Sequence, residues 1–307
     1  MTTAIQVDHI SKGFTTGKEK VSAVKDVTFT VGKGELFGLV GPDGAGKTTL
    51  FRILTTLLLA DSGSASVDGF DVVKDVQSIR KRVGYMPGKF SLYPDLTVAE
   101  NLAFFATLFN TSLKENYDLV RAIYHQIEPF EKRKAGALSG GMKQKLALSC
   151  ALIHRPSVLF LDEPTTGVDA VSRKEFWELL RGLQAAGISI LVSTPYMDEA
   201  SLCDRVALMQ EGKIMDINSP QGITANFTKP LYAIRSRNMY ELMRALQQHE
   251  AVESCYPFGQ QHHVVFKDDR LRPDDIRTLV TPLAGDGLEV ERIQPTIEDS
   301  FMDLMHQ

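Results

Sequence analysis

The stretch that most constrains this chain runs from residue 41 to residue 48 and reads Gly-Pro-Asp-Gly-Ala-Gly-Lys-Thr. It lies between an apolar run, Leu36–Val40, that predicts a buried strand and residues 49–54, which predict the start of a helix. A strand, a glycine-rich turn and a helix N-terminus direct backbone N–H groups and the positive end of the helix dipole at one point. Glycine also lets the backbone approach an anion without a Cβ in the way. The stretch therefore predicts a phosphate-binding loop.

The chemistry of such a loop assigns roles to its side chains and its backbone. We expect Lys47 to reach the β- and γ-phosphates of a nucleoside triphosphate, and the Thr48 hydroxyl to ligate Mg²⁺. The predicted nucleotide-binding residues of the loop are Gly41, Pro42, Asp43, Gly44, Ala45, Gly46, Lys47, Thr48 and Thr49.

The composition is that of a soluble globular protein. The chain has 307 residues, 43% hydrophobic and 23% charged, enough for one large domain or two of ordinary size. Its net charge of −4 argues against a nucleic-acid surface, which usually needs a basic footprint. No apolar run approaches the roughly 18 residues of a membrane span, and the N-terminus lacks the pattern of a signal peptide. Cys150, Cys203 and Cys255 are isolated in the sequence, so we expect reduced thiols without a metal.

A second block of chemistry begins near residue 138. There a serine and two adjacent glycines precede a helix-like run, where they either expose N–H groups to an anion or simply cap the helix. The run Val158–Asp162 is apolar until its last residue and predicts a buried parallel strand, with Glu163 directly after it. Acids at the carboxyl end of such a strand lie where ligands bind in open α/β sheets. We expect Asp162 to hold Mg²⁺ and Glu163 to activate the attacking water; the alternative is a solvent-facing pair of acids.

The order of the apolar runs predicts an α/β fold in two domains. Strand-like runs at residues 5–10 and 27–31 flank a polar turn at about residues 15–20. Residues 88–145 are mainly helical in pattern, with a capping box formed by Thr97 and Glu100. We predict a mixed parallel sheet with this helical subdomain in residues 1–220, followed by a small α+β domain in residues 221–307.

In this order the motifs resemble those of the ATP-binding cassette (ABC) family, the nucleotide-binding subunits of ABC transporters. Residues 41–48 match its Walker A motif, residues 158–163 its Walker B motif with the catalytic glutamate, and Asp169 its D-loop. Phe14 falls where the family places the aromatic side chain that stacks on adenine. The residues that match the signature motif are Leu138, Ser139, Gly140, Gly141, Met142 and Gln144. The resemblance covers about residues 5–220 and implies a P-loop NTPase fold.

The resemblance also implies cofactors and partners. ATP and Mg²⁺ would bind between two cassettes, identical or different, that meet head to tail, so that Walker A of one faces the signature of the other. Lys47 and Glu163 would be the catalytic residues. Closure on ATP would drive separate membrane-spanning permease subunits, which residues 89–94 would face. The chain would be a peripheral protein at the cytoplasmic face of the bacterial inner (plasma) membrane.

Two positions depart from the family's pattern. Gly88 stands where the family has the Q-loop glutamine, and Pro195 stands where it has the switch histidine. Neither residue supplies a polar side chain, and proline also lacks a backbone donor. Losing one preorganised polar group typically costs about 10²–10³-fold in rate. We expect a slow ATP site here and an intact signature that completes a faster site on another cassette, as in the first half of tandem-cassette bacterial efflux ATPases. The alternative is an ordinary ATPase for which Glu163 suffices.

From about residue 231 the pattern becomes β-α-β-β-α-β, which resembles a ferredoxin-like module. His262 and His263 are adjacent, so on a strand they would face opposite sides and could not bind one metal together. Residues 295–302 resemble the closing tail of cassettes that serve type-2 exporters of drugs, lipids and polysaccharides. This likeness favours export over import.

Three functions are open at this stage. The leading one is ATP hydrolysis coupled to export, and the second is a catalytically weak nucleotide-binding subunit that regulates a competent cassette. Gly88 and Pro195 favour the second function, whereas Glu163 opposes it. The third, a cassette that acts on ribosomes or DNA, is opposed by the net charge and the export-type tail.

Overall fold

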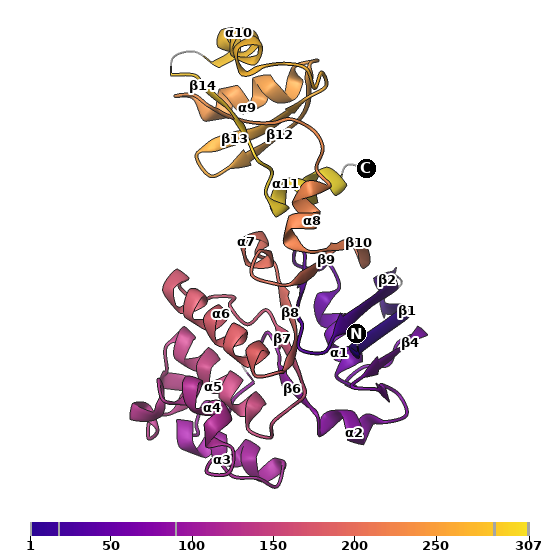
Figure 1. Ribbon diagram of the computed structural model, residues 1–307, viewed down its shortest axis with the longest axis vertical. Coiled ribbons are helices and arrows are strands. Elements are labelled where there is room, and N and C mark those ends of the chain that lie inside the picture. The colour runs from indigo at the N-terminus through magenta and orange to yellow at the C-terminus, as the bar shows by residue number, and fades with distance from the viewer. Residues whose placement is uncertain (1, 18, 90, 285–286, 306–307) are drawn as a thin grey trace. The chain divides into compact units, whose positions relative to one another are not determined.

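The computed structural model describes residues 2–17, 19–89, 91–284 and 287–305. The chain divides into two compact units, Met1–Pro220 and Gln221–Gln307 (Figure 1). A short helix, α8 (Pro220–Ala225), begins at the boundary between them.

The larger sheet of the first unit is mainly parallel, as the apolar runs predict. Its strand order is β10-β9-β3-β8-β7-β6, and of these strands only β10 pairs antiparallel. Strands β3, β7 and β8 are buried along their whole length, which explains why their central residues are apolar. The six strands are β3 (Leu36–Val40), β6 (Val83–Met86), β7 (Val158–Asp162), β8 (Ser189–Thr194), β9 (Arg205–Gln210) and β10 (Lys213–Asn218).

A second sheet of the same unit is antiparallel, with the order β2-β1-β4-β5. Its strands are β1 (Thr3–Thr16), β2 (Glu19–Gly32), β4 (Ser62–Val67) and β5 (Phe70–Asp71). The β1–β2 hairpin is much longer than predicted, because the ladder continues to the pair Thr16 and Glu19. The predicted polar turn is therefore mostly strand: backbone pairing holds a hairpin together beyond the point where its side chains reach the core.

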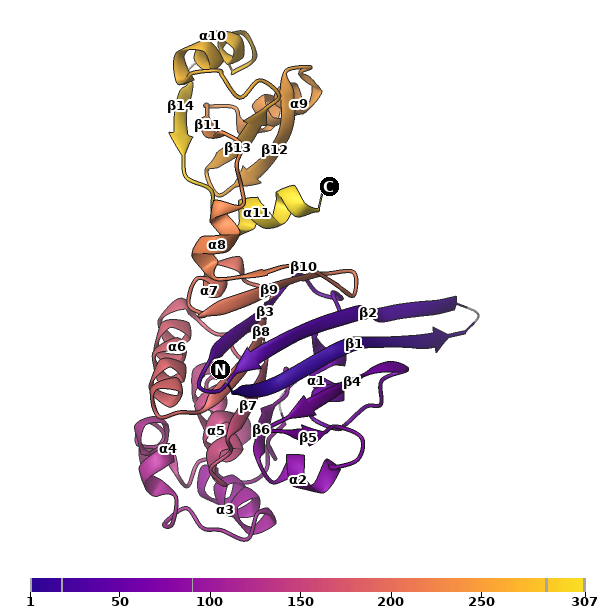
Figure 2. The ribbon, with the colours of Figure 1, turned by 45° about the vertical axis from the view of Figure 1, so that its right-hand side comes forward.

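Helix α1 (Lys47–Leu54) lies between the two sheets, as both views show (Figures 1 and 2). It contacts β2, β4 and β7, and its apolar side chains belong to a core shared with both sheets. Phe51 of α1 meets Phe160 of β7 edge to face, with ring centres 5.9 Å apart. This packing determines where the N-terminus of α1 lies, and with it the phosphate loop.

The remaining helices of the first unit include the predicted helical subdomain. Helices α3, α4 and α5 gather on one side of the parallel sheet, away from the β1–β2 hairpin (Figure 1). The capping box of α3 is confirmed: the Thr97 hydroxyl accepts from Glu100 N, and the Glu100 carboxylate accepts from Thr97 N. These helices are α2 (Val76–Arg80), α3 (Val98–Leu108), α4 (Tyr117–Tyr124), α5 (Gly140–Leu152), α6 (Ala170–Ala185) and α7 (Met197–Ala200), with 3₁₀ turns η1 (Glu128–Phe130) and η2 (Ala135–Ala137). Of the helices in the described residues, none combines the length and the hydrophobicity that a membrane crossing requires.

The second unit has the predicted β-α-β-β-α-β order. Its four strands pair antiparallel in the order β12-β13-β11-β14, and the helices α9 and α10 share one apolar core with the sheet. Its elements are β11 (Leu231–Arg235), α9 (Met239–Gln248), β12 (Val252–Phe258), β13 (Gln261–Phe266), α10 (Pro273–Ala284), β14 (Glu289–Ile293) and α11 (Ile297–Leu304).

The two adjacent histidines of β13 contact different elements. His262 hydrogen-bonds through Nε2 to Met239 O on α9, with 2.8 Å between the two atoms. His263 Nδ1 lies 2.6 Å from Asp299 Oδ1, and both side chains are buried. Asp299 also accepts from the backbone and hydroxyl of Thr296, so it caps α11 while it pairs with the sheet. The tail motif is thus attached to the sheet through one carboxylate.

Burial raises the pKa of Asp299, but the hydrogen bonds from His263 and Thr296 outweigh burial and lower this pKa below its usual value. The ionised form therefore stabilises the second unit above the ordinary carboxyl pKa of about 4, and this contribution is lost as pH falls through the lowered pKa. We expect Asp299→Ala to reduce the local unfolding free energy around α11 by about 1–3 kcal/mol at pH 7, and by less at pH 3. Amide hydrogen exchange of α11 and β13 in the full chain measures this effect.

The control for this prediction is Asp274→Ala, because Asp274 is exposed in the first turn of α10. It should leave exchange in α11 unchanged. A difference between Asp299→Ala and the unmodified chain that grows as the pH falls would contradict the assigned sign.

Candidate functional site

The glycine-rich loop occupies residues 41–46, between the end of β3 and the start of α1. Gly46 has φ 105°, a left-handed conformation that disfavours any residue with a side chain. A Cβ at Gly46 would also lie 2.2 Å from Ala23 O of β2, and a Cβ at Gly41 would lie 2.0 Å from Met209 O of β9. These two glycines are therefore required by the close approach of neighbouring strands.

The backbone of the loop and of the first turn of α1 presents a group of open N–H donors. Five of these amides donate no hydrogen bond to another protein group within the described part of the chain. Ala45 O, which the amide of Thr49 would reach in a regular helix, instead accepts from Gly212 N at 2.9 Å. The open amides belong to Gly44, Gly46, Lys47, Thr48 and Thr49. Together with the positive end of the α1 dipole they form a site for an anion.

The Lys47 side chain is buried against this loop, with 3% of its surface exposed. Its ammonium group donates to Gly41 O at 2.7 Å and to Pro42 O at 3.0 Å, and lies 3.2 Å from Glu163 Oε1. A positive charge thus lies between the loop and the acid that follows β7.

The two acids at the end of β7 are held by Ser193 of the adjacent strand β8. Asp162 is buried, and its Oδ1 accepts from the Ser193 hydroxyl at 2.7 Å. Glu163 has the left-handed φ of 50°, and its N–H donates to Ser193 Oγ at 3.0 Å. Sequence reasoning did not single out Ser193; its only signal was a hydroxyl residue at the carboxyl end of a buried strand.

The oxygen atoms of this site fit a magnesium ion. Within the described residues, neither Asp162 Oδ2 nor the Thr48 hydroxyl has a protein hydrogen-bond partner. Both are oxygen donors of the kind that Mg²⁺ prefers. In the same residues, no group of three or more His, Cys, Asp or Glu side chains could hold a metal. A magnesium ion here would therefore depend on phosphate oxygens and water for its other ligands.

Gly88 and Pro195, the two positions predicted to depart from the family's pattern, lie close to this site. A Cβ at Gly88 would lie 3.0 Å from Asp162 O, so the backbone after β6 passes directly beside the acid. Pro195 follows Thr194, whose carbonyl accepts from Gly41 N of the loop at 3.2 Å. Nearby on β6, burial and secondarily the charge of Asp162 raise the pKa of Tyr85 to about 12. The phenol therefore stays neutral beside the acids.

The signature segment and the D-loop lie against each other. Ser139 caps α5 by accepting from Met142 N at 3.4 Å, and a Cβ at Gly141 would lie 2.8 Å from Ser172 Oγ on α6. Asp169 caps α6, and hydrogen bonds led by the one from Ser172 N lower the pKa of its carboxyl group. In this single chain the signature therefore acts as a helix cap. The segment around Gly88, helix α5 and the D-loop together line a hollow of about 330 Å³. Leu138 directly precedes Ser139, the N-cap of α5, and Gln144 lies in the second turn of that helix.

Phe14 lies on the β1–β2 hairpin, opposite Val21. Both side chains are exposed, 41% for Phe14 and 52% for Val21. Val21 is two residues from Ala23, whose carbonyl lies against the phosphate loop, so the hairpin presents an open aromatic ring on the strand pair that borders the loop. Contact of Phe14 with adenine stays a prediction.

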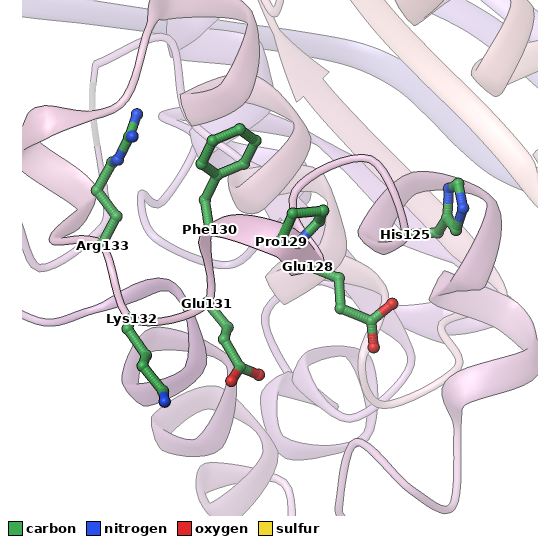
Figure 3. Close-up of a pocket in the computed structure, with 7 residues that line it drawn as sticks. All are labelled: His125, Glu128, Pro129, Phe130, Glu131, Lys132 and Arg133. Atoms are coloured by element: carbon green, nitrogen blue, oxygen red, sulfur yellow. The ribbon is translucent and has the colours of Figure 1, made fainter.

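A larger hollow, of about 620 Å³, lies in the helical subdomain and does not include the motif residues (Figure 3). Its charged side chains point in different directions: Arg133 extends away from Lys132 and Glu131, with its guanidinium 4.7 Å from the Phe130 ring centre. The charged groups do not converge on one point, so this hollow has no features of a reaction site. It is lined by His125, Glu128, Pro129, Phe130, Glu131, Lys132 and Arg133.

We expect Gly46→Ala to abolish nucleotide binding, because the Cβ would displace the loop from β2 and the backbone strain alone costs about 1–3 kcal/mol. The matched control is Gly182→Ala on the exposed face of α6, where a Cβ meets nothing within 4 Å. The control should stabilise the chain by about 0.5–1 kcal/mol and retain binding. Thermal unfolding with and without ATP measures both effects, and a Gly46→Ala variant that ATP still stabilises would contradict the prediction.

Comparison with known proteins agrees with this geometry. Residues 24–166 match the family described as ABC transporter. The probable multidrug ABC transporter ATP-binding protein YbhF of Escherichia coli is 41% identical over 291 residues, 92% of this chain and 49% of YbhF. The chain therefore spans about half the length of that relative, in keeping with the expected likeness to one half of a tandem-cassette protein.

Two further matches cover more of the length of the related protein. The doxorubicin resistance ATP-binding protein DrrA of Mycobacterium tuberculosis is 34% identical over 291 residues, 90% of this chain and 84% of DrrA. The dimeric structure of MJ0796, a bacterial ABC transporter cassette, matches with a TM-score of 0.64 and 25% identity, covering 70% of this chain and 98% of MJ0796. From the ordered motifs, the fold and these matches we conclude that the chain belongs to the ABC transporter family, as one of its ATP-binding proteins.

Proposed function

We propose that this chain binds Mg²⁺ and ATP at residues 41–49 and hydrolyses ATP as the energy-supplying subunit of an exporter. The observation that carries the proposal is the convergence of open loop amides, the Lys47 ammonium and two adjacent carboxylates. The amides and Lys47 bind the phosphates, and Thr48 and Asp162 hold the metal. Phe14 stacks on adenine.

The contacts of Lys47 suggest how binding and catalysis are connected. Its ammonium exchanges backbone carbonyls and Glu163 for phosphate oxygens when ATP enters, since it can donate only three hydrogen bonds. Glu163 is then free to accept a proton from the attacking water. Thr48 and Asp162 would hold a Mg²⁺ ion, which when bound would supply positive charge to the phosphates.

A complete site requires a second cassette. In this chain Ser139, one of the residues that match the signature, caps α5. We propose that Ser139, Gly140 and Gly141 contact the ATP of a partner cassette, while the partner's signature closes the site at Lys47. The MJ0796 cassette was solved as a dimer, which supports this arrangement.

We further propose that the chain's own site turns over slowly. Gly88 and Pro195 lie beside Asp162 and the phosphate loop but offer no side-chain donor or acceptor. A glutamine at position 88 would also need a shift of a few tenths of an ångström, because its Cβ would lie 3.0 Å from Asp162 O. The faster site would be the one that this chain's signature completes on a different cassette.

The permease partner is proposed from an exposed aromatic surface. Tyr93 and Phe104 are 47% and 41% exposed, and their rings meet edge to face at 4.8 Å. Asn101, fully buried, exchanges hydrogen bonds with the backbone N and O of Tyr93 and so fixes the backbone that carries the ring. This surface includes part of residues 89–94, predicted to face the permease; Phe90 lies outside the described residues. Such contacts would hold the chain at the cytoplasmic face of a bacterial membrane.

Export, rather than import, is supported by the names of YbhF and DrrA and by the closing tail motif. The competing function is a catalytically weak subunit that binds nucleotide and regulates a competent cassette. Gly88 and Pro195 favour this alternative, whereas the placement of Glu163 beside Lys47 opposes it.

We expect the purified chain to hydrolyse Mg²⁺-ATP at a low rate that Glu163→Gln reduces at least about 10²-fold, without loss of ATP binding. The matched control is Glu178→Gln, an exposed glutamate on α6. Steady-state phosphate release and nucleotide binding provide the two readouts. Equal activity of Glu163→Gln and the unmodified chain would contradict the assigned base.

Measuring ATPase activity after this chain is mixed with a second cassette distinguishes the slow-site hypothesis from an ordinary ATPase. Addition of a cassette that carries both the glutamine and the histidine should restore strong activity, and Ser139→Arg in this chain should abolish that gain. A normal transporter rate for the chain alone would refute the slow-site hypothesis and leave the ATPase assignment intact.

A further inference from the structure

We infer that Ser193 is a positioning residue that sets the orientation of both acids of the ATP site. Ser193 is fully buried at the carboxyl end of β8, between the phosphate loop strand β3 and the acid-bearing strand β7. Its hydroxyl contacts Asp162 and the backbone of Glu163 at the same time. This inference rests on the proposed function, because it concerns how the same site holds its metal and its base.

The direction of the two hydrogen bonds follows from the groups involved. The Glu163 N–H can only donate, so the Ser193 oxygen accepts from it. The hydroxyl has a single proton, and Asp162 Oδ1, an acceptor at 2.7 Å, receives it. The Ser193 hydroxyl therefore accepts from the backbone of Glu163 and donates to the carboxylate of Asp162, and these roles cannot be exchanged.

For Asp162, this contact selects which oxygen is available to a metal. Within the described residues, the bond from Ser193 is the only hydrogen bond to this carboxylate, and it engages Oδ1. Oδ2 is left open. A buried carboxylate without the Ser193 donor could rotate and present either oxygen, so the hydroxyl keeps the metal-facing oxygen in a single position.

For Glu163, the contact holds an unfavourable backbone conformation. The residue has φ 50°, and its N–H reaches both the hydroxyl and the carbonyl oxygen of Ser193, at 3.0 and 3.1 Å. Left-handed backbone persists only where the surroundings enforce it. Ser193 thus helps to direct the Glu163 carboxylate toward Lys47, 3.2 Å away.

Because Gly88 and Pro195 supply no polar side chain, Ser193 becomes more important for the orientation of the acids. Neither Gly88 nor Pro195 has a side chain that can hydrogen-bond to the acids or to the metal's water. A Cβ at Gly88 would already lie 3.9 Å from Asp162 Cγ, so a longer side chain there would have been in reach. The Ser193 hydroxyl is left as the polar side chain that orders the site from the β8 side.

The test compares Ser193→Ala, Ser193→Thr and Ser193→Val with a control on the same strand. Ser189→Ala is the matched control: Ser189 is also a buried serine of β8, but its hydroxyl accepts from Gly34 N, at the opposite end of the strand from the acids. Thr and Val have nearly the same shape and both suit a strand, so their difference isolates the hydroxyl. Binding of a fluorescent ATP analogue is measured over a Mg²⁺ titration and again in excess chelator.

We expect Ser193→Ala and Ser193→Val to raise the half-saturating Mg²⁺ concentration by about 10-fold or more, as loss of an outer contact to a metal ligand usually does. Affinity for the analogue in chelator should stay within about twofold, since the loop amides and Lys47 are unchanged. Ser193→Thr should resemble the unmodified chain, and Ser189→Ala should change only the thermal stability.

Equal Mg²⁺ requirements for the Thr and Val variants would overturn the inference, even if Ser193→Ala did not fold. An unmodified chain that binds the analogue without any response to Mg²⁺ would instead refute the proposed metal site itself. The two failures are therefore distinguishable.

Discussion

The structure depends on the close packing of the phosphate loop against strands that are distant in sequence. Ala23 O of β2 and Met209 O of β9 approach the loop so closely that Gly46 and Gly41 have no room for a side chain. Gly212 N takes the carbonyl of Ala45 that a regular first turn of α1 would use. These contacts fix the loop at the start of α1, where helix N–H groups have no intrahelical acceptor, so the anion site exists before any ligand arrives.

The acids of the site depend in the same way on a neighbouring strand. Parallel pairing of β7 with β8 sets Asp162 beside Ser193, and the chain then turns through the left-handed Glu163 toward Lys47. Strand pairing therefore orders the acids of the site, while Lys47 is held by the phosphate loop at the start of α1. This order is retained although Gly88 and Pro195 provide no polar side chains.

The second unit uses one carboxylate for two purposes. Asp299 caps α11 and pairs with His263 inside the sheet, so the tail motif is tied to β13 rather than left as a free end. Helices α9 and α10 bury their apolar faces in a core of their own. The unit thus carries its own stabilising contacts, and the tail is attached by contacts within the unit.

The sequence by itself determined the fold class and the family, because the phosphate-loop pattern and the order of the motifs depend on local patterns of glycine, apolar and acidic residues. The departures at Gly88 and Pro195 stay predictions. The sequence did not predict the length of the β1–β2 hairpin, where backbone pairing continues through a polar stretch. Only the tertiary structure decided that Ser193 contacts Asp162, that Lys47 meets Glu163, and that Asp299 joins His263. These contacts join residues 31, 116 and 36 positions apart. Pairing of β7 with β8 and the packing of helices against the sheets bring them together, and a local sequence pattern does not encode which distant elements pack on one another.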